Sequence, residues 1–163
     1  MATHLKNLSD FSHTTIPSGA AFKIAIVVAE WNAKITGALY EGALQTLLKH
    51  GVTKDNIITA AVPGSFELSA AAEILLNRKA DLNAVICIGC VIQGDTKHFD
   101  FICEAVANGI TNVSIKHSKP VIFGVLTTNN EEQAMDRAGG KHGNKGDEAA
   151  ITALKMADFA AQF

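Results

Sequence analysis

Four stretches of the chain are apolar at almost every position and rich in valine and isoleucine: residues 23–29, 57–62, 84–92 and 121–126. Near-continuous apolar runs are typical of parallel strands buried on both faces, whereas a half-exposed strand alternates apolar and polar residues. Helical patterns separate the runs, and we expect helices over residues 35–50, 66–77, 98–113, 131–137 and about 145–163. Strand and helix therefore alternate, which predicts an α/β fold with a parallel sheet and right-handed crossovers.

The length and composition fit one domain. A chain of 163 residues, 48% of them hydrophobic, is long enough to bury a single core and too apolar to remain disordered. We expect residues 1–21 to form a loose arm, with a short extended piece near Ile16 and Pro17, and residues 22–163 to form the domain. Gly51 stands where a glycine is expected after a helix.

The charge balance and the hydropathy exclude two classes of partner. Fourteen Lys and Arg face 16 Asp and Glu with no basic run, so we expect no nucleic acid. No segment approaches the ~18 apolar residues of a membrane helix, and the first twenty residues lack the apolar stretch of a signal peptide. These patterns predict a cytoplasmic protein.

The cysteines predict neither a disulfide framework nor a metal site. Cys87 and Cys90 form a CxxC, and Cys103 is the third cysteine. The pair lies within an apolar strand, where side chains three residues apart point to opposite faces. A redox CxxC is instead typical of a strand-to-helix junction. A structural zinc site needs four ligands, and no second motif completes one.

Parallel sheets bind ligands beyond the carboxyl ends of their strands, which directs attention to residues 30–34, 63–67, 93–98 and 127–130. In the first loop, Trp31 and Asn32 can stack on a planar ring and bind its edge, or Trp31 can cover the end of the core. In the second, Ser65 is a candidate helix N-cap and Glu67 lies in the first turn. The alternative is that Glu67 and the helix-start amides face a polar ligand.

The loop VIQGDTKHFD carries the strongest functional pattern. Gly94, Asp95 and Thr96 lie between a strand and a helix, where free N–H groups attract phosphate. His98 follows in the first turn, and histidine is the side chain suited to moving protons near neutral pH. Alternatively, Asp95 or Thr96 caps the helix and His98 is a surface residue.

Residues 137–146 combine four glycines with three cations. Arg137, Lys141 and Lys145 can bring positive charge to a phosphate, or the segment can be a flexible, solvated hinge between two helices. The chain has no Walker motif, GxGxxG, nucleophile elbow or HExxH.

Several long motifs together resemble one protein family. They are the pair Trp31-Asn32 and the segments VPGSFEL, GCVIQGDTKHFD, KPVIFGVLTT and EQAMDRAGGKHGNKGDEAA, between about Phe22 and Phe159. On these motifs the chain closely resembles the lumazine synthase family. The resemblance implies a flavodoxin-like, three-layer sandwich with a central four-stranded parallel sheet. It also implies condensation of 5-amino-6-(D-ribitylamino)uracil with 3,4-dihydroxy-2-butanone 4-phosphate, giving 6,7-dimethyl-8-ribityllumazine, phosphate and water without cofactor or metal. This is the penultimate step of riboflavin biosynthesis.

The resemblance also assigns roles to residues. It implies that His98 shuttles protons and that Arg137 is the cationic partner of the phosphate. The residues implied to contact the substrates are Trp31, Asn32, Ser65, Phe66, Glu67, Cys90, Val91, Ile92, Gly94, Asp95, Thr96, Phe123 and Lys145. Of these, Phe123 and Lys145 would come from an adjacent subunit of a pentamer. Gln93 stands where many relatives have arginine, which leaves the charge of the phosphate pocket open, and Ser69 replaces a common proline.

Assembly and rival functions depend on the same family comparison. Residues 137–146 lack the insertion found in relatives that remain pentamers, which predicts an icosahedral shell of twelve pentamers, with riboflavin synthase as a candidate partner. Three alternatives stay open: a noncatalytic flavin- or lumazine-binding member of the fold, a riboflavin synthase that dismutates lumazine, and a structural shell protein. The presence of both His98 and Arg137 disfavours the first alternative.

Overall fold

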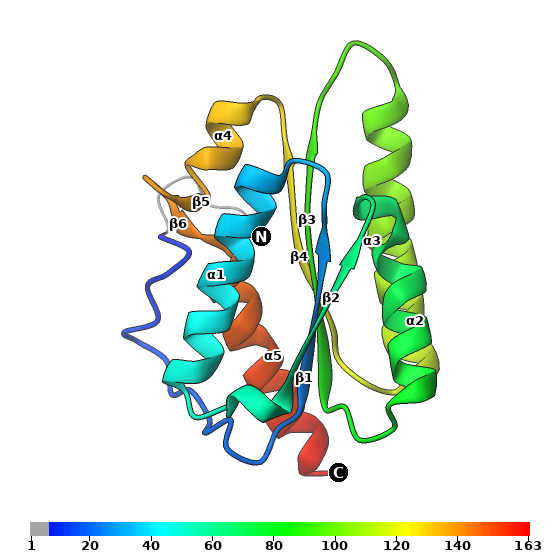
Figure 1. The fold of residues 1–163 in the computed structure, drawn as a ribbon. Helices are drawn as coiled ribbons and strands as arrows, with labels where there is room; N and C mark the ends of the chain where they lie inside the picture. Colours follow the sequence, from blue (N-terminus) through cyan, green and yellow to red (C-terminus); the bar gives the residue numbers. More distant parts are fainter. Residues whose placement is uncertain (1–6) are drawn as a thin grey trace.

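The computed structural model describes residues 7–163, which form a three-layer α/β fold (Figure 1). Its central sheet has four parallel strands in the order β2-β1-β3-β4. The strands are β1 Ile24–Ala29, β2 Ile57–Val62, β3 Ala84–Ile92 and β4 Val121–Thr128. The predicted parallel sheet is confirmed, with a later end for β4, and the strand order matches the first four strands of a flavodoxin-like sheet.

Helices cover both faces of this sheet, as Figure 1 shows. On one face lie α1 Ala33–Lys49, α4 Glu131–Met135 and α5 Lys145–Ala161; on the other lie α2 Leu68–Arg78 and α3 His98–His117. Every predicted helix is present with shifted ends. Gly51 follows α1 with a φ of +96°, the left-handed conformation expected of a glycine after a helix.

The two faces of the sheet bury separate apolar cores, which explains the unbroken apolar runs. Ile24 and Ile26 of β1 point into the core beneath α1 and α5. Ala25 and Val27 of the same strand point into the core beneath α2 and α3. Because consecutive strand residues alternate between faces, a strand covered on both sides must be apolar at each position.

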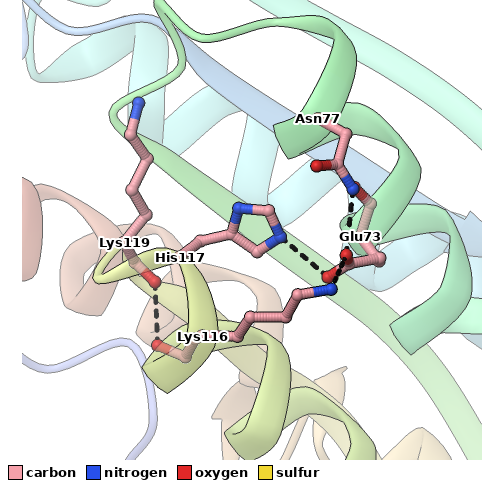
Figure 2. A network of polar contacts seen from close by, with 6 residues as sticks. Glu73, Asn77, Lys116, His117 and Lys119 are labelled. Carbon is pink, nitrogen blue, oxygen red and sulfur yellow. Dashed lines mark hydrogen bonds and ion pairs between the residues drawn. The ribbon is translucent and has the colours of Figure 1, made fainter.

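A polar cluster joins α2 to the end of α3 on the second face (Figure 2). Glu73 of α2 accepts a hydrogen bond from Lys116, and His117 Nε2 lies 2.7 Å from Glu73 Oε2. Asn77 Nδ2 donates to the same carboxylate at 2.9 Å. These bonds, the one from Lys116 first, lower the pKa of Glu73 to about 2. The cluster extends α3 to His117, four residues past the predicted end at 113.

The segment between α4 and α5 is a short antiparallel hairpin, so the alternative of a flexible hinge is wrong. Strand β5 Ala138–Gly140 pairs with β6 Gly143–Asn144. Asn144 caps α5 by accepting from Gly146 N at 2.7 Å, and its Nδ2 donates to Ala38 O of α1 at 2.9 Å. Gly139 and Gly143 adopt positive φ values at the turn. The hairpin is therefore held by α1 as well as by its own bonds.

Two further short elements complete the described chain. They are the 3-10 turns η1 Lys54–Asn56 and η2 Ser65–Glu67. The prediction of Ser65 as a helix N-cap is wrong: Gly64 is the residue before η2, and α2 starts only at Leu68. The tight Pro63-Gly64 turn is followed by this extra 3-10 turn, which places Ser65 inside it.

Residues 7–21 hold no helix or strand. Leu8 N donates to His142 O at 2.8 Å, Ser9 Oγ donates to Asp147 at 2.5 Å, and Ile16 packs against the core beneath α1. The other part of the predicted arm, residues 1–6, lies outside the described residues, and the division at residue 21 stays a prediction. In the described range, no helix combines the length and apolarity needed to cross a bilayer.

Candidate active site

A cavity of about 280 Å³ opens at the carboxyl ends of the central strands. Its wall brings together residues from three of the four loops that the sequence pointed to. They are Trp31, Asn32, Gly64, Ser65, Phe66, Cys90, Val91, Ile92, His98 and Ile102. Gly64 and Ile102 are additions to the predicted set. Ile102 lies one helical turn after His98, and that i, i+4 spacing is the pattern that would have identified it.

The topology explains why the cavity forms here. Strands β1 and β3 are neighbours, but the chain leaves β1 for α1 on one face and β3 for α3 on the other. The connections therefore diverge and leave a crevice beyond the two strand ends. Open α/β sheets bind ligands at such a switch point.

Two aromatic side chains stand open to solvent at this cavity. Trp31 is 73% exposed and Phe66 is 57% exposed. A tryptophan that covered the end of the core would be largely buried, so that alternative for Trp31 is wrong. Exposed aromatic faces beside a cavity offer apolar surface on which a planar ring can stack.

Cys90 contributes to the cavity as a protonated, buried thiol. Burial raises the pKa of Cys90 to about 11 and that of Cys87 to about 12. Cys90 packs in the core beneath α1, and Cys87 in the core beneath α2 and α3. The two thiols therefore lie on opposite faces of β3, as the strand periodicity predicts, and neither has the thiolate character that redox chemistry needs.

A second, polar cavity of about 170 Å³ adjoins the start of α3. Its wall is formed by the consecutive residues 93–97 together with Phe99 and Asp100. Lys97 precedes the first helical residue, His98, and no side chain caps the helix. Asp95 therefore does not act as the cap, and Thr96 Oγ1 accepts only a long bond of 3.4 Å from His98 N. His98, itself exposed, lines the aromatic cavity, while its sequence neighbours Lys97 and Phe99 line the polar one.

Four predicted site residues lie outside both cavity walls: Glu67, Phe123, Arg137 and Lys145. Glu67 is one residue beyond the wall residue Phe66. Phe123 of β4 packs against the core beneath α2 and α3. Among residues 7–163, no arginine or lysine lines the aromatic cavity.

Arg137 and Lys145 lie together at the base of the β5-β6 hairpin. Lys145 N donates to Arg137 O at 2.8 Å. The guanidinium of Arg137 donates to Gln133 O at 2.9 Å, and Lys145 pairs with Glu148 at 2.7 Å. The hairpin packs on α1, on the face opposite to α3. Arg137 and Lys145 are therefore neighbours in one hairpin, and both lie outside the cavity walls of their own chain.

Comparison with known proteins gives the family. The model of the 6,7-dimethyl-8-ribityllumazine synthase family matches residues 21–161. The chain belongs to this lumazine synthase family. Proteins named 6,7-dimethyl-8-ribityllumazine synthase are similar over nearly the whole length. The one from Cytophaga hutchinsonii is 64% identical, covering 96% of this chain and 97% of its own.

Two other relatives of the same name agree with this placement in the lumazine synthase family. The Porphyromonas gingivalis protein is 56% identical over 96% of this chain and 97% of its own. The Parabacteroides distasonis protein is 52% identical over 99% of this chain and 100% of its own. The similarity to lumazine synthases therefore extends over the described fold.

Proposed function

We propose that this protein is a transferase-type synthase that condenses 5-amino-6-(D-ribitylamino)uracil with 3,4-dihydroxy-2-butanone 4-phosphate. The products are 6,7-dimethyl-8-ribityllumazine, phosphate and water, in the penultimate step of riboflavin biosynthesis. The observation that carries the proposal is the pair of adjoining cavities with His98 between them. One cavity has the exposed aromatic faces that suit a pyrimidine, and the other has the helix-start amides that suit a phosphate.

Each substrate has its own set of proposed contacts. Trp31 stacks on the pyrimidine, whose edge meets Cys90, Val91 and Ile92. The ribityl chain runs past Asn32 and the Ser65-Phe66-Glu67 turn. Gly94, Asp95 and Thr96 hold the phosphate. Asp95 takes part through its backbone N–H, because its carboxylate would repel the anion.

The chemistry needs proton transfers rather than a cofactor or metal. The amine of the pyrimidine adds to the ketone with loss of one water, and phosphate is then eliminated. The second amine closes the ring onto the remaining carbonyl with loss of a second water. His98 can accept and return protons at each step. General acid–base help of this kind is typically worth ~10²–10⁴-fold in rate. Orientation of two reactants in one site can contribute ~7–11 kcal/mol, so we rank positioning above proton transfer.

The wall of the polar cavity includes Lys97, whereas Arg137, the proposed partner of the phosphate, lies outside both cavities of its own chain. We infer that a neighbouring copy contributes Arg137 together with Phe123 and Lys145. Identical head-to-tail contacts of this kind close into rings, and we propose a pentamer. A backbone hydrogen bond joins Lys145 to Arg137 within one chain, so a neighbour that contributes one of these residues would contribute both.

Location and partners complete the proposal. All three cysteines are free thiols, which suits a reducing compartment, and we place the enzyme in the cytoplasm. Riboflavin synthase consumes the proposed product, and this makes it a candidate partner. No nucleic acid or membrane has a part in the reaction.

An assay with both substrates tests the function. Purified protein should form lumazine, followed by its absorbance, and inorganic phosphate in equal amounts. Lumazine supplied without the two substrates should remain unchanged. Binding of the pyrimidine without turnover would instead identify a noncatalytic binding protein. Consumption of lumazine alone would identify a riboflavin synthase.

A further inference from the structure

Asn32 has an unusual backbone conformation at the edge of the aromatic cavity. Its φ is 60° and its ψ is 44°, in the left-handed region. Among residues 7–163, the other non-glycine residue with positive φ is Ser118. Left-handed backbone is disfavoured for residues with a Cβ, although asparagine tolerates it better than most. A residue held in this conformation needs surrounding bonds that stabilise it.

The side chain of Asn32 makes such a bond to the neighbouring strand. Its Nδ2 donates to the carbonyl oxygen of Cys90 at 3.0 Å. The β1–β3 ladder ends at the pair Val28 and Ile88, two residues before Cys90. The amide of Asn32 thus supplies a donor to a β3 carbonyl beyond the last pair of the ladder. Buried backbone carbonyls require such a partner, and here a side chain provides it.

Backbone bonds hold the same turn from the other side. Trp31 N donates to Pro63 O at 3.1 Å, which joins the turn to the segment after β2. Asn32 O accepts from Ile35 N at 2.8 Å and starts α1. The turn is therefore fixed to β2, to α1 and, through the Asn32 amide, to β3.

Trp31 depends on this turn for its position. Its side chain is 73% exposed, so packing against the core does little to orient it. The backbone conformation of the following residue sets the direction of the chain at Trp31. A change at Asn32 should therefore move the indole without unfolding the protein.

We propose that Asn32 is a positioning residue: its left-handed turn and its bond to Cys90 hold Trp31 at the angle at which the indole stacks on the pyrimidine. This inference rests on the proposed function for the identity of the stacked ring. It is separate from the proposed contact between Asn32 and the ribityl chain: here the Asn32 amide, bonded to the Cys90 carbonyl, acts on the pyrimidine through Trp31.

Trp31 is the single tryptophan of the chain, so its fluorescence reports its own motion. Two variants remove the amide donor of Asn32 while leaving its left-handed turn accessible. Asn32→Gly keeps the left-handed turn accessible and removes the amide; Asn32→Asp keeps a side chain that tolerates the turn and replaces the donor by an acceptor. Ser118→Gly is the matched control, because it changes the other left-handed residue at the far end of α3.

Time-resolved fluorescence anisotropy of the free, assembled protein is the first measurement. Both Asn32 variants should show faster and wider indole motion than the parent, with unchanged circular dichroism, while Ser118→Gly should match the parent. Because no substrate is needed, this result is independent of the proposed reaction. Indole motion equal to the parent in both Asn32 variants would overturn the proposal.

Steady-state kinetics is the second measurement. The KM for the pyrimidine should rise about five- to tenfold, as expected for one lost hydrogen bond, while the KM for the phosphorylated ketone changes less than about twofold. A weakened pyrimidine affinity with unaltered anisotropy would reject the positioning role and assign the whole effect to the proposed contact of Asn32 with the ribityl chain. Altered anisotropy in a protein that lacks synthase activity would uphold the positioning role and reject the proposed substrate.

Discussion

At the scale of single residues, His98 has the most informative position. It is the first residue of α3, it is exposed, and it lines the aromatic cavity while its neighbours on both sides, Lys97 and Phe99, line the polar one. A histidine on an arbitrary stretch of surface would not stand between two cavities. This position suits a group that moves protons between two bound reactants.

We predict that His98→Ala slows turnover by about 10²-fold but leaves measurable activity, because positioning of the reactants survives loss of proton transfer. His13→Ala, which changes an exposed histidine of the N-terminal segment, serves as control. An unchanged rate in His98→Ala would refute the proton role, and complete inactivity in an assembled variant would refute the ranking of positioning above proton transfer.

Most residues of the aromatic cavity were predictable because they follow or end a strand, whereas Ile102, inside α3, was not predicted. Trp31, Ser65 and Cys90 lie at carboxyl ends that a parallel sheet brings to one edge. The actual distance of Arg137 and Lys145 from this cavity was not predictable, since it depends on the hairpin that packs on α1. Local sequence patterns report the strand ends and do not report which copy of the chain a loop faces.

At the scale of elements, the Glu73 cluster joins α2 to α3 near the end opposite to the site (Figure 2). The pKa of Glu73 is lowered from 4.5 to about 2 in the folded protein. A lowered carboxyl pKa stabilises the fold above the unfolded-state pKa, and that contribution is lost as the pH falls through the folded-state pKa. The cluster should therefore matter near neutrality and lose its effect between pH 4.5 and about 2.

We predict that Glu73→Gln lowers the melting temperature at pH 7 and that its difference from the parent shrinks as the pH falls below 4.5. Glu104→Gln is the matched control, since Glu104 is an exposed carboxylate of α3 with no ion pair within the described residues. Thermal unfolding over a pH series measures the effect. A Glu73→Gln difference that stays constant down to pH 3 would contradict the linkage.

The contact between α1 and α5 depends on a residue without a side chain. A Cβ at Gly146, in the first turn of α5, would overlap the carbonyl oxygen of Leu39 in α1. A Cβ at Gly37, on the exposed side of α1, would meet nothing within 4 Å. The two glycines therefore differ in the space available for a side chain, although both lie in helices.

We predict that Gly146→Ala destabilises the fold by about 1–3 kcal/mol or more, because the two backbones must separate. Gly37→Ala should instead leave the free energy of unfolding unchanged from the parent or raise it by about 0.4–1 kcal/mol, because alanine lowers the entropy of the unfolded chain. Denaturant unfolding measures both. Equal stability of the two variants would show that α1 and α5 do not approach as closely as described.

The sequence predicted the regular elements well and the irregular ones poorly. The four strands and the longer helices follow from apolar patterns that local residues determine. The prediction of burial on both faces is wrong for β2, the edge strand, which has no fully buried residue. The hairpin β5-β6 has too few residues to show a period, and its cap residue Asn144 is bonded to Ala38, far away in the sequence. The 3-10 turn η2 forms at Ser65, where the sequence had indicated only a helix cap.

At the scale of the whole molecule, the compact hairpin bears on assembly. His142 N donates to Asp136 O at 2.8 Å, which closes the segment without any protruding insertion. We therefore predict that pentamers join into an icosahedral shell. Light scattering of purified protein should show a species far above five chain masses. A stable species of five chain masses in every buffer would reject the shell and retain the pentamer.

The central claim is that one copy supplies the cavities with His98 and its neighbour supplies Arg137. Co-expression of differently tagged His98→Ala and Arg137→Ala chains, with purification of mixed assemblies, tests it directly. If each site draws on two chains, random mixing leaves about a quarter of the sites intact, and activity should return to about a quarter of the parent level. Activity no higher than that of the two variants assembled separately would contradict the account.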